Sequence, residues 1–295
     1  MKSMDHMEQK DVYSMPSVVA EIGCNHKGDM AIARELIRLA KESGADYAKF
    51  QKRHPRELLT DEQYNSPHQV PYNAYGSTYG AHREFLEFDR AQHQELKNYC
   101  ASVGIAYACS VWDISSANDI ISLDPDYIKI PSACNNHEEL IELLLKEYTG
   151  QVHISLGMTG HEEERLLMHQ LKGHEERIVL YACTSGYPVP FEDVCLLEIS
   201  RLKKAYPQAT IGFSGHHLGI AVDIAAYTLG AQWIERHFTK DRTWKGTDHA
   251  ASLEPPGLSK LIRDLNACYK SLRYKSHDIL AIEREQREKL KFRKT

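Results

Sequence analysis

The chain has 295 residues, with 36 lysines and arginines against 41 aspartates and glutamates and a formal net charge of −5 at pH 7. This balance excludes a protein that binds nucleic acid through a basic surface, because no excess of positive charge is available to neutralise phosphates. No apolar run approaches the roughly 18 residues that a membrane-spanning helix needs, and residues 1–16 are polar without an apolar signal core. We therefore expect a cytoplasmic protein that binds neither nucleic acid nor a membrane.

The seven cysteines are an odd number without paired spacing. This is typical of a reduced cytosolic protein with small buried thiols, so we expect no disulfides. Cys24, in the loop after the first predicted strand, is the one thiol that we consider as a metal ligand.

Short β-branched or apolar runs predict eight strands, most of them followed by a helical pattern. The predicted strands are 17–21, 47–51, 105–110, 127–130, 152–155, 178–182, 210–213 and 233–235. The predicted helices include 30–42, 92–102, 138–146, 162–171, 193–205, 219–229 and 256–274. Strict alternation predicts a parallel sheet, and eight units predict an α/β protein closed into a (β/α)₈ TIM barrel. An open doubly wound sheet is the alternative, although no Gly-x-Gly-x-x-Gly turn supports it.

The chain divides into a polar N-terminal extension (1–16), a barrel domain (17–275) and a charged tail (276–295) with a helix expected at 282–290. Within the barrel domain, a polar insert rich in tyrosine and histidine runs from about residue 52 to 92. A loop longer than about 15 residues is usually functional or disordered. This one follows the second strand at the catalytic face of a barrel, so we expect it to cover a substrate.

Each predicted strand delivers a polar or charged side chain to the end of the barrel that carries chemistry. In chain order these are Glu21, Lys49, Ser110, Lys129 with Ser132, Ser155, Thr184 with Ser185, Ser214 with His216, and Glu235 with His237. Helix caps or snorkelling lysines would explain one or two of them. Lys49 and Lys129, however, lie inside apolar runs, where a lysine is costly unless an anion meets it. The pattern predicts a pocket for a multiply charged anion such as a phosphorylated carboxylate.

His216 and His237 are 21 residues apart, each just past a predicted strand, with a predicted helix between them. In a strand–helix–strand unit with parallel strands, two such residues emerge at the same end of adjacent strands. Glu235, Asp248 and His249 lie nearby. The spacing predicts a site for a divalent metal ion, and two imidazole ligands leave room for water and substrate oxygens.

These residues lie in segments that resemble the sialic acid synthase (N-acetylneuraminate synthase) family, over about residues 17 to 272. The matching segments are AEIGCNHKGD (20–29), KFQ (49–51), KIPSACNN (129–136), SLGM (155–158), CTSGYP (183–188), SGHHLG (214–219), ERHFTKD (235–241) and GTDHAASLEP (246–255). Members of this family condense phosphoenolpyruvate with a sugar aldehyde to make nonulosonic acids. The resemblance therefore implies a carbon–carbon bond-forming transferase that makes a 2-keto-3-deoxy acid and releases phosphate.

Carried over by position, the resemblance implies a divalent metal ion on His216 and His237, most often Mn²⁺, with Mg²⁺, Co²⁺, Fe²⁺ and Zn²⁺ left open. It implies substrate binding by Lys49, Ser110, Lys129, Ser132, Ser155, Ser185, Tyr187 and Ser214. It implies roles in catalysis for Glu21, Glu235 and Asp248. It also implies a homodimer.

Three departures from the family pattern bear on the acceptor and on closure of the site. Gly215 stands where aspartate is common, and Ser185 where asparagine is frequent. Members usually carry a C-terminal antifreeze-like domain, which we expect this chain to lack, so that the insert or a separate lid chain would close the site.

The acceptor stays open between N-acetylmannosamine, its 6-phosphate, a diacetamido hexose and a non-acetylated aldose. The alternative functions are another metal-dependent phosphosugar aldolase or isomerase, and a non-catalytic sugar-phosphate-binding barrel.

Overall fold

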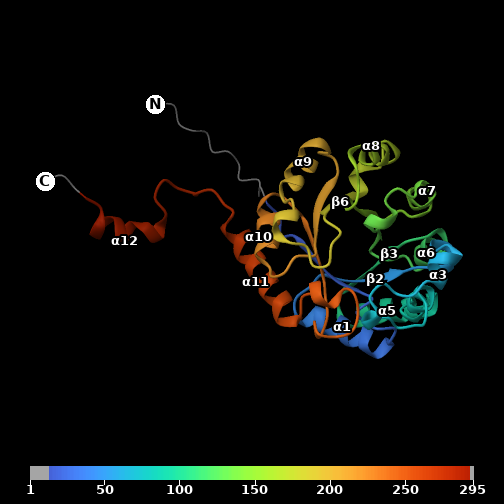
Figure 1. The fold of residues 1–295 in the computed structure, drawn as a ribbon. Helices are drawn as coiled ribbons and strands as arrows, with labels where there is room; N and C mark the ends of the chain where they lie inside the picture. Colours follow the sequence, from blue (N-terminus) through green and yellow to red (C-terminus); the bar gives the residue numbers. More distant parts are fainter. Residues whose placement is uncertain (1–12, 293–295) are drawn as a thin grey trace.

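Eight parallel strands close into one barrel in the order β1 to β8 in the computed structural model, which describes residues 13–292 (Figure 1). The strands are β1 (Ser17–Gly23), β2 (Tyr47–Lys52), β3 (Ala106–Val111), β4 (Tyr127–Ile130), β5 (Gln151–Ser155), β6 (Ile178–Cys183), β7 (Thr210–Gly215) and β8 (Trp233–His237). Pairing of β1 with β8 closes the ring. The predicted TIM barrel is confirmed, and the doubly wound alternative is wrong.

A helix follows each strand and covers the outside of the barrel. These helices are α1 (Met30–Glu42), α5 (Arg90–Val103), α6 (Ile114–Ile121), α7 (Glu138–Glu147), α8 (His161–Gln170), α9 (Leu197–Ala205), α10 (Ala221–Thr228) and α11 (Pro255–Ser271). The sequence analysis missed α6, which is short and is capped by Asp113. It also started α9 four residues too early, because Cys195 adopts a left-handed backbone (φ 53°) that separates the helix from a preceding 3₁₀ turn.

The interior of the barrel is filled in layers, because side chains two residues apart on a strand point to the same face. Tyr47, Tyr127 and Trp233 pack together with the buried His153 in an aromatic layer. Two residues further along the same strands, Lys49, Lys129 and Glu235 follow on the same face. The aromatic layer therefore supports a layer of buried charges at the carboxyl ends of the strands.

The insert between β2 and α5 is folded rather than extended. It forms the short helices α2 (Pro55–Leu58), α3 (Asp61–Asn65) and α4 (Tyr79–Phe85) and a 3₁₀ turn at Pro71–Asn73. It contacts the loop after β8, where the Tyr75 hydroxyl donates to the Lys245 carbonyl and the Gly246 amide donates to Asn73 Oδ1 at 3.4 Å. These contacts hold the insert over the carboxyl end of the barrel.

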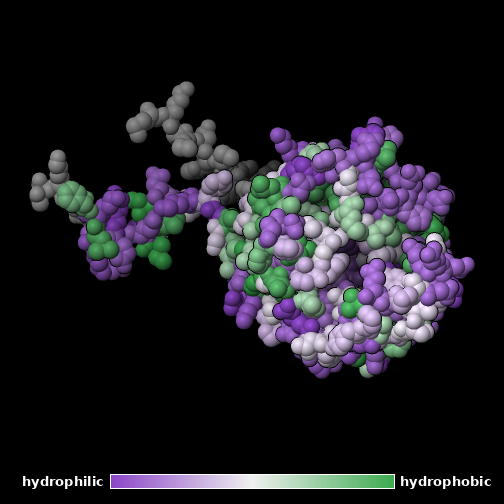
Figure 2. Space-filling view, in the orientation of Figure 1, coloured by the Kyte–Doolittle hydropathy of each residue, from purple (hydrophilic) through white to green (hydrophobic). Residues whose placement is uncertain are grey.

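The tail forms helix α12 (Ala281–Leu290), which confirms the helix predicted at 282–290. It stands clear of the barrel, and its surface is mostly hydrophilic (Figures 1 and 2). Only residues 13–16 of the predicted N-terminal extension lie within the described residues. Across residues 13–292, no helix combines the length and the apolar character needed to cross a bilayer.

Candidate active site

A cavity of about 270 Å³ lies at the carboxyl ends of the strands. Twelve of the thirteen predicted site residues line it: Glu21, Lys49, Ser110, Lys129, Ser132, Ser155, Ser185, Tyr187, Ser214, His216, Glu235 and His237. Asp248 is the exception, and its Oδ2 lies 3.8 Å from Nδ1 of His237. The barrel brings these residues together because the carboxyl ends of all eight strands meet at one end.

Two lysines and two carboxylates form a balanced cluster at the floor of the cavity. Lys49 Nζ makes an ion pair with Glu21 and donates to Ser110 Oγ at 2.8 Å. Lys129 Nζ donates to Glu235 Oε1 at 2.6 Å, and Ser214 Oγ donates to the same oxygen at 3.2 Å. The four charged residues are at most 4% exposed. The two buried lysines predicted a pocket for a multiply charged anion, and in the free protein the carboxylates of Glu21 and Glu235 balance their charges.

The charges in this cluster set the protonation of Glu235. Burial alone would raise the pKa of this carboxyl, but Lys129 and Lys49 lower its pKa from the ordinary 4.5 to about 2. For Lys49, burial is outweighed by the Glu21 and Glu235 carboxylates, which raise its pKa. Burial lowers the pKa of Lys129. Glu235 is therefore an anion at neutral pH and is suited to stabilising positive charge rather than to donating a proton.

The depressed pKa of Glu235 predicts a component of stability that is sensitive to acid. The folded pKa lies below the unfolded one, so the contribution is present above pH 4.5 and is lost as the pH falls toward 2. Between pH 5 and pH 2, we expect the free energy of unfolding of the wild type to fall by about 3 kcal/mol more than that of Glu235→Gln. Urea denaturation at both pH values measures this difference, and equal falls in the two proteins would contradict the assignment.

His216 and His237 lie side by side at the ends of β7 and β8, with ring centroids 5.3 Å apart. His216 Nδ1 donates to the carbonyl oxygen of Thr184 at 2.9 Å, which leaves the lone pair on Nε2. Burial, followed by the neighbouring His237, lowers the pKa of His216 to about 3, so the ring is neutral at pH 7. His237 Nδ1 is buried without a hydrogen-bond partner. A neutral imidazole beside an orphaned ring nitrogen fits a divalent metal ion.

Tyr187 forms a wall above the histidine pair. Its ring centroid lies 4.2 Å from that of His216 and 5.7 Å from that of His237. Burial raises the pKa of its hydroxyl, which therefore stays protonated. About half of the residue remains exposed, so it borders the mouth of the cavity.

The structure adds residues that the sequence analysis did not single out. Gln51 Nε2 donates to Glu21 Oε1 at 2.8 Å, and Trp112 and Met158 line the cavity. Gln51 and Met158 lie inside the matching sequence segments, which could have identified them. Trp112 carries no such signal. The thiol of Cys24, the cysteine considered as a metal ligand, accepts from Arg53, and burial raises its pKa to about 11, which disfavours the thiolate that a metal requires.

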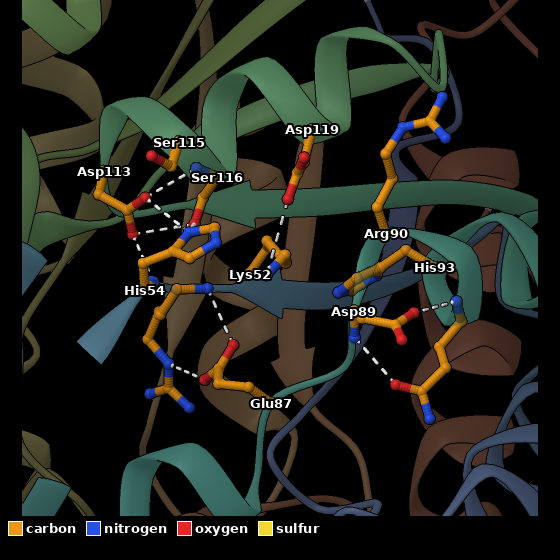
Figure 3. A network of polar contacts seen from close by, with 12 residues as sticks. Lys52, His54, Glu87, Asp89, Arg90, His93, Asp113, Ser115, Ser116 and Asp119 are labelled. Atoms are coloured by element: carbon orange, nitrogen blue, oxygen red, sulfur yellow. Dashed lines mark hydrogen bonds and ion pairs between the residues drawn. The ribbon is translucent and has the colours of Figure 1, made fainter. Parts of the chain in front are cut away.

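A second group of side chains with metal-ligating atoms lies outside the cavity, at His54, Glu57 and Asp113. The Asp113 carboxylate accepts hydrogen bonds from the amides of His54 and Ser116, both at 2.7 Å, and from Ser116 Oγ at 2.9 Å (Figure 3). Asp113 is the N-cap of α6, and Glu57 accepts from the Ser115 amide near the same helix end. We therefore interpret this group as a helix cap rather than a metal site.

Comparison with known proteins identifies the family. The model of the NeuB family matches residues 36–277. The chain belongs to this family. It is 38% identical over 278 residues to N-acetylneuraminate-9-phosphate synthase of Homo sapiens, covering 92% of this chain and 76% of that protein. It is 33% identical over 258 residues to N,N'-diacetyllegionaminic acid synthase of Campylobacter jejuni, covering 86% of this chain and 77% of that protein.

A solved structure shares the fold. The crystal structure of N-acetylneuraminic acid (sialic acid) synthetase from Leptospira borgpetersenii, in complex with citrate, matches with a TM-score of 0.79 and 27% identity, over 94% of this chain and 91% of that one. The predicted membership of the sialic acid synthase family is thereby confirmed, and the chain is an enzyme of that family. The named relatives make different products, so they do not select the acceptor sugar.

Proposed function

We propose that this enzyme condenses phosphoenolpyruvate with an aldose to a 2-keto-3-deoxy acid of the nonulosonic type and releases phosphate. The observation that carries the proposal is the cavity, where two buried lysines, five serine hydroxyls and a histidine pair meet. Lysines and hydroxyls suit the carboxylate and phosphate of phosphoenolpyruvate. The synthase names of the relatives support the same reaction.

We assign phosphoenolpyruvate to Lys49, Lys129 and the serines of the strand ends. Ser132 and Ser185 come from loops after β4 and β6, yet both lie against Gly157, where a Cβ would come within 2.7 Å of Ser132 Oγ and 2.4 Å of Ser185 Oγ. The Gly157 amide also donates to Ser132 Oγ at 3.1 Å. The absence of a side chain at residue 157 lets the two hydroxyls converge, as an anionic oxygen of the substrate would require.

We assign the acceptor sugar to the part of the cavity beside Glu21, Tyr187 and Asp248. His216 and His237 would hold a divalent metal ion, for which we propose Mn²⁺. That ion would supply Lewis-acid polarisation of the acceptor aldehyde oxygen. Asp248 and Tyr187 each contact one of these histidines, which supports assigning the sugar beside the proposed metal ion.

The proposed chemistry starts with attack of C3 of phosphoenolpyruvate on the aldehyde carbon, which forms the new carbon–carbon bond. Positive charge then develops at C2, where the anionic Glu235 or Glu21 stabilises it electrostatically. Water adds at C2, and one of its protons passes to the alkoxide formed from the aldehyde oxygen. The second proton goes to the phosphate as the C2–O bond breaks, which leaves the 2-keto acid. The lysines hold the carboxylate and phosphate oxygens throughout.

The aldose dependence of phosphate release tests the proposal. With Mn²⁺ and phosphoenolpyruvate, we expect release of inorganic phosphate only when a suitable aldose is added. A panel of N-acetylmannosamine, its 6-phosphate, a 2,4-diacetamido hexose and a non-acetylated aldose identifies the acceptor. Isomerisation or cleavage of a phosphosugar without use of phosphoenolpyruvate would instead support the aldolase or isomerase alternative. We further propose a homodimer, which sedimentation velocity measures directly.

We propose that the insert covers the acceptor, because its contacts with Lys245 and Gly246 lie next to Asp248. Replacing residues 66–82 by a short Gly-Ser linker is expected to raise the KM for the aldose by at least about tenfold, since the bound sugar loses its positioning. Mn²⁺ affinity should not change. Tyr75→Phe, which removes one of the two contacts, should give a smaller effect in the same direction. Unchanged kinetics in both variants would refute a covering role.

A further inference from the structure

The two histidines of the proposed metal site each have a buried neighbour, and these neighbours contact each other. His217 follows His216 in the turn between β7 and α10, and Arg236 precedes His237 in β8. Glu235 and His237 line the cavity, so Arg236 points to the outer face of the barrel. There it lies beneath the turn that carries His216 and His217, with 1% of its surface exposed.

Arg236 ties this turn to β8 through several hydrogen bonds. Its Nη2 donates to the backbone carbonyl of His217 at 2.6 Å, and its Nη1 donates to the carbonyl of Gly219 at 2.8 Å. Nη1 also donates to Asp223 Oδ2, at the start of α10, at 2.6 Å. His217 Nε2 lies 3.3 Å from the same carboxylate oxygen. One side chain therefore holds two carbonyls of the turn and the beginning of the following helix.

Gly215 makes room for this arrangement. A Cβ at residue 215 would lie 2.8 Å from Cε1 of His217 and 2.8 Å from Cε1 of Phe213, closer than packed side chains approach. The buried His217 ring therefore occupies the space that a side chain at residue 215 would need. This accounts for glycine at the position where the sequence analysis noted a departure from aspartate.

We propose that Arg236, Asp223 and His217 are positioning residues that set the relative placement of His216 and His237. The inference rests on the proposed role of that pair as metal ligands. Arg236 and His237 are adjacent on one rigid strand, and Arg236 holds the backbone next to His216. Without the hydrogen bonds of Arg236, the turn that carries His216 would become free to move. Lys49 and Lys129 would stay in place, because they lie on β2 and β4.

The test compares metal binding with phosphoenolpyruvate binding in the full-length protein. The main variant is Asp223→Asn/Arg236→Met, which removes both buried charges together and so leaves neither unpaired. Arg236→Lys keeps the charge but not the forked geometry. The matched control is Glu164→Gln/Arg201→Met, which makes the same exchange in an arginine–carboxylate pair between α8 and α9, away from the cavity.

Electron paramagnetic resonance of free Mn²⁺ gives the metal dissociation constant, and quenching of tryptophan fluorescence gives that of phosphoenolpyruvate without metal. We expect the double variant to bind Mn²⁺ about 10- to 100-fold more weakly, Arg236→Lys to lose less, and the control to match the wild type. The affinity of each variant for phosphoenolpyruvate should stay within about twofold of the wild-type affinity, since substitutions outside a binding site usually have small effects on it.

Unchanged Mn²⁺ affinity in the double variant, or equal losses for both ligands, would overturn the positioning role. A wild-type protein that binds none of Mn²⁺, Mg²⁺, Co²⁺, Fe²⁺ and Zn²⁺ would overturn the proposed metal site itself and this inference with it. The two failures are distinguishable because the second appears before any substitution is made.

Discussion

Replacing His237 by alanine is expected to lower aldose-dependent phosphate release by at least about a thousandfold, because a metal ligand supports several kcal/mol of transition-state stabilisation. Phosphoenolpyruvate should still bind, since the residues assigned to it lie on other strands. The fold should also survive. His237 Nδ1 has no hydrogen-bond partner in the free protein, so the truncation leaves no protein group unpaired at that atom.

Steady-state release of phosphate and fluorescence titration with phosphoenolpyruvate measure the two effects in the same preparation. The matched control is His93→Gln, which changes a buried histidine outside the cavity that contacts the Tyr107 hydroxyl at 2.8 Å. That variant should lose stability and keep its turnover. Full turnover in His237→Ala would contradict the assignment of this residue to the metal.

Replacing Lys129 by methionine is expected to weaken phosphoenolpyruvate binding by about a hundredfold, because each charge-assisted hydrogen bond to a substrate anion is worth about 1.5–3 kcal/mol. The same change removes the nearest positive charge from Glu235. An anionic substrate would then meet a carboxylate whose charge Lys129 no longer balances. The lost hydrogen bond to the substrate and this repulsion both act against binding.

Lys52→Met is the control for this variant. Lys52 is also a buried lysine at the end of a strand, but it lies outside the cavity, where its ammonium is 3.8 Å from Asp119 (Figure 3). Fluorescence titration should show phosphoenolpyruvate affinity within about twofold of the wild type for Lys52→Met. If both variants lost the same amount of phosphoenolpyruvate affinity, removal of any buried lysine would damage the barrel. That result would contradict the assignment of Lys129 to phosphoenolpyruvate.

The barrel could be predicted from sequence because its signals are local. Each strand is a short apolar run, and the helix Met30–Glu42 was predicted with the bounds of the structure from its helical spacing. The ends of the strands then placed eleven of the site residues in one cavity, since chain order and parallel topology leave little freedom. Tyr187, which also lines the cavity, was named through the family resemblance alone, and Asp248, which lies in a loop beyond β8, was placed less closely.

What the sequence could not predict depends on contacts between distant segments. The helices of the insert are four to seven residues long, too short to be stable alone, and they depend on capping and on contacts such as that of Tyr75 with Lys245. Glu21 and Glu235 meet the buried lysines only because the barrel closes and brings β1, β2, β4 and β8 together at the floor of the cavity. The contact of Arg236 with Asp223 and His217 is likewise visible only in the folded chain.

Mass analysis of the product most directly tests the central claim that this cavity joins phosphoenolpyruvate to a sugar. The protein, Mn²⁺ and phosphoenolpyruvate are incubated with each aldose of the panel, and the products are separated and weighed. The account predicts one new acid, with the mass of the aldose plus phosphoenolpyruvate plus water minus phosphoric acid, formed in equal amount to the phosphate released. Phosphate released without that acid, or an altered aldose with phosphoenolpyruvate unconsumed, would contradict it.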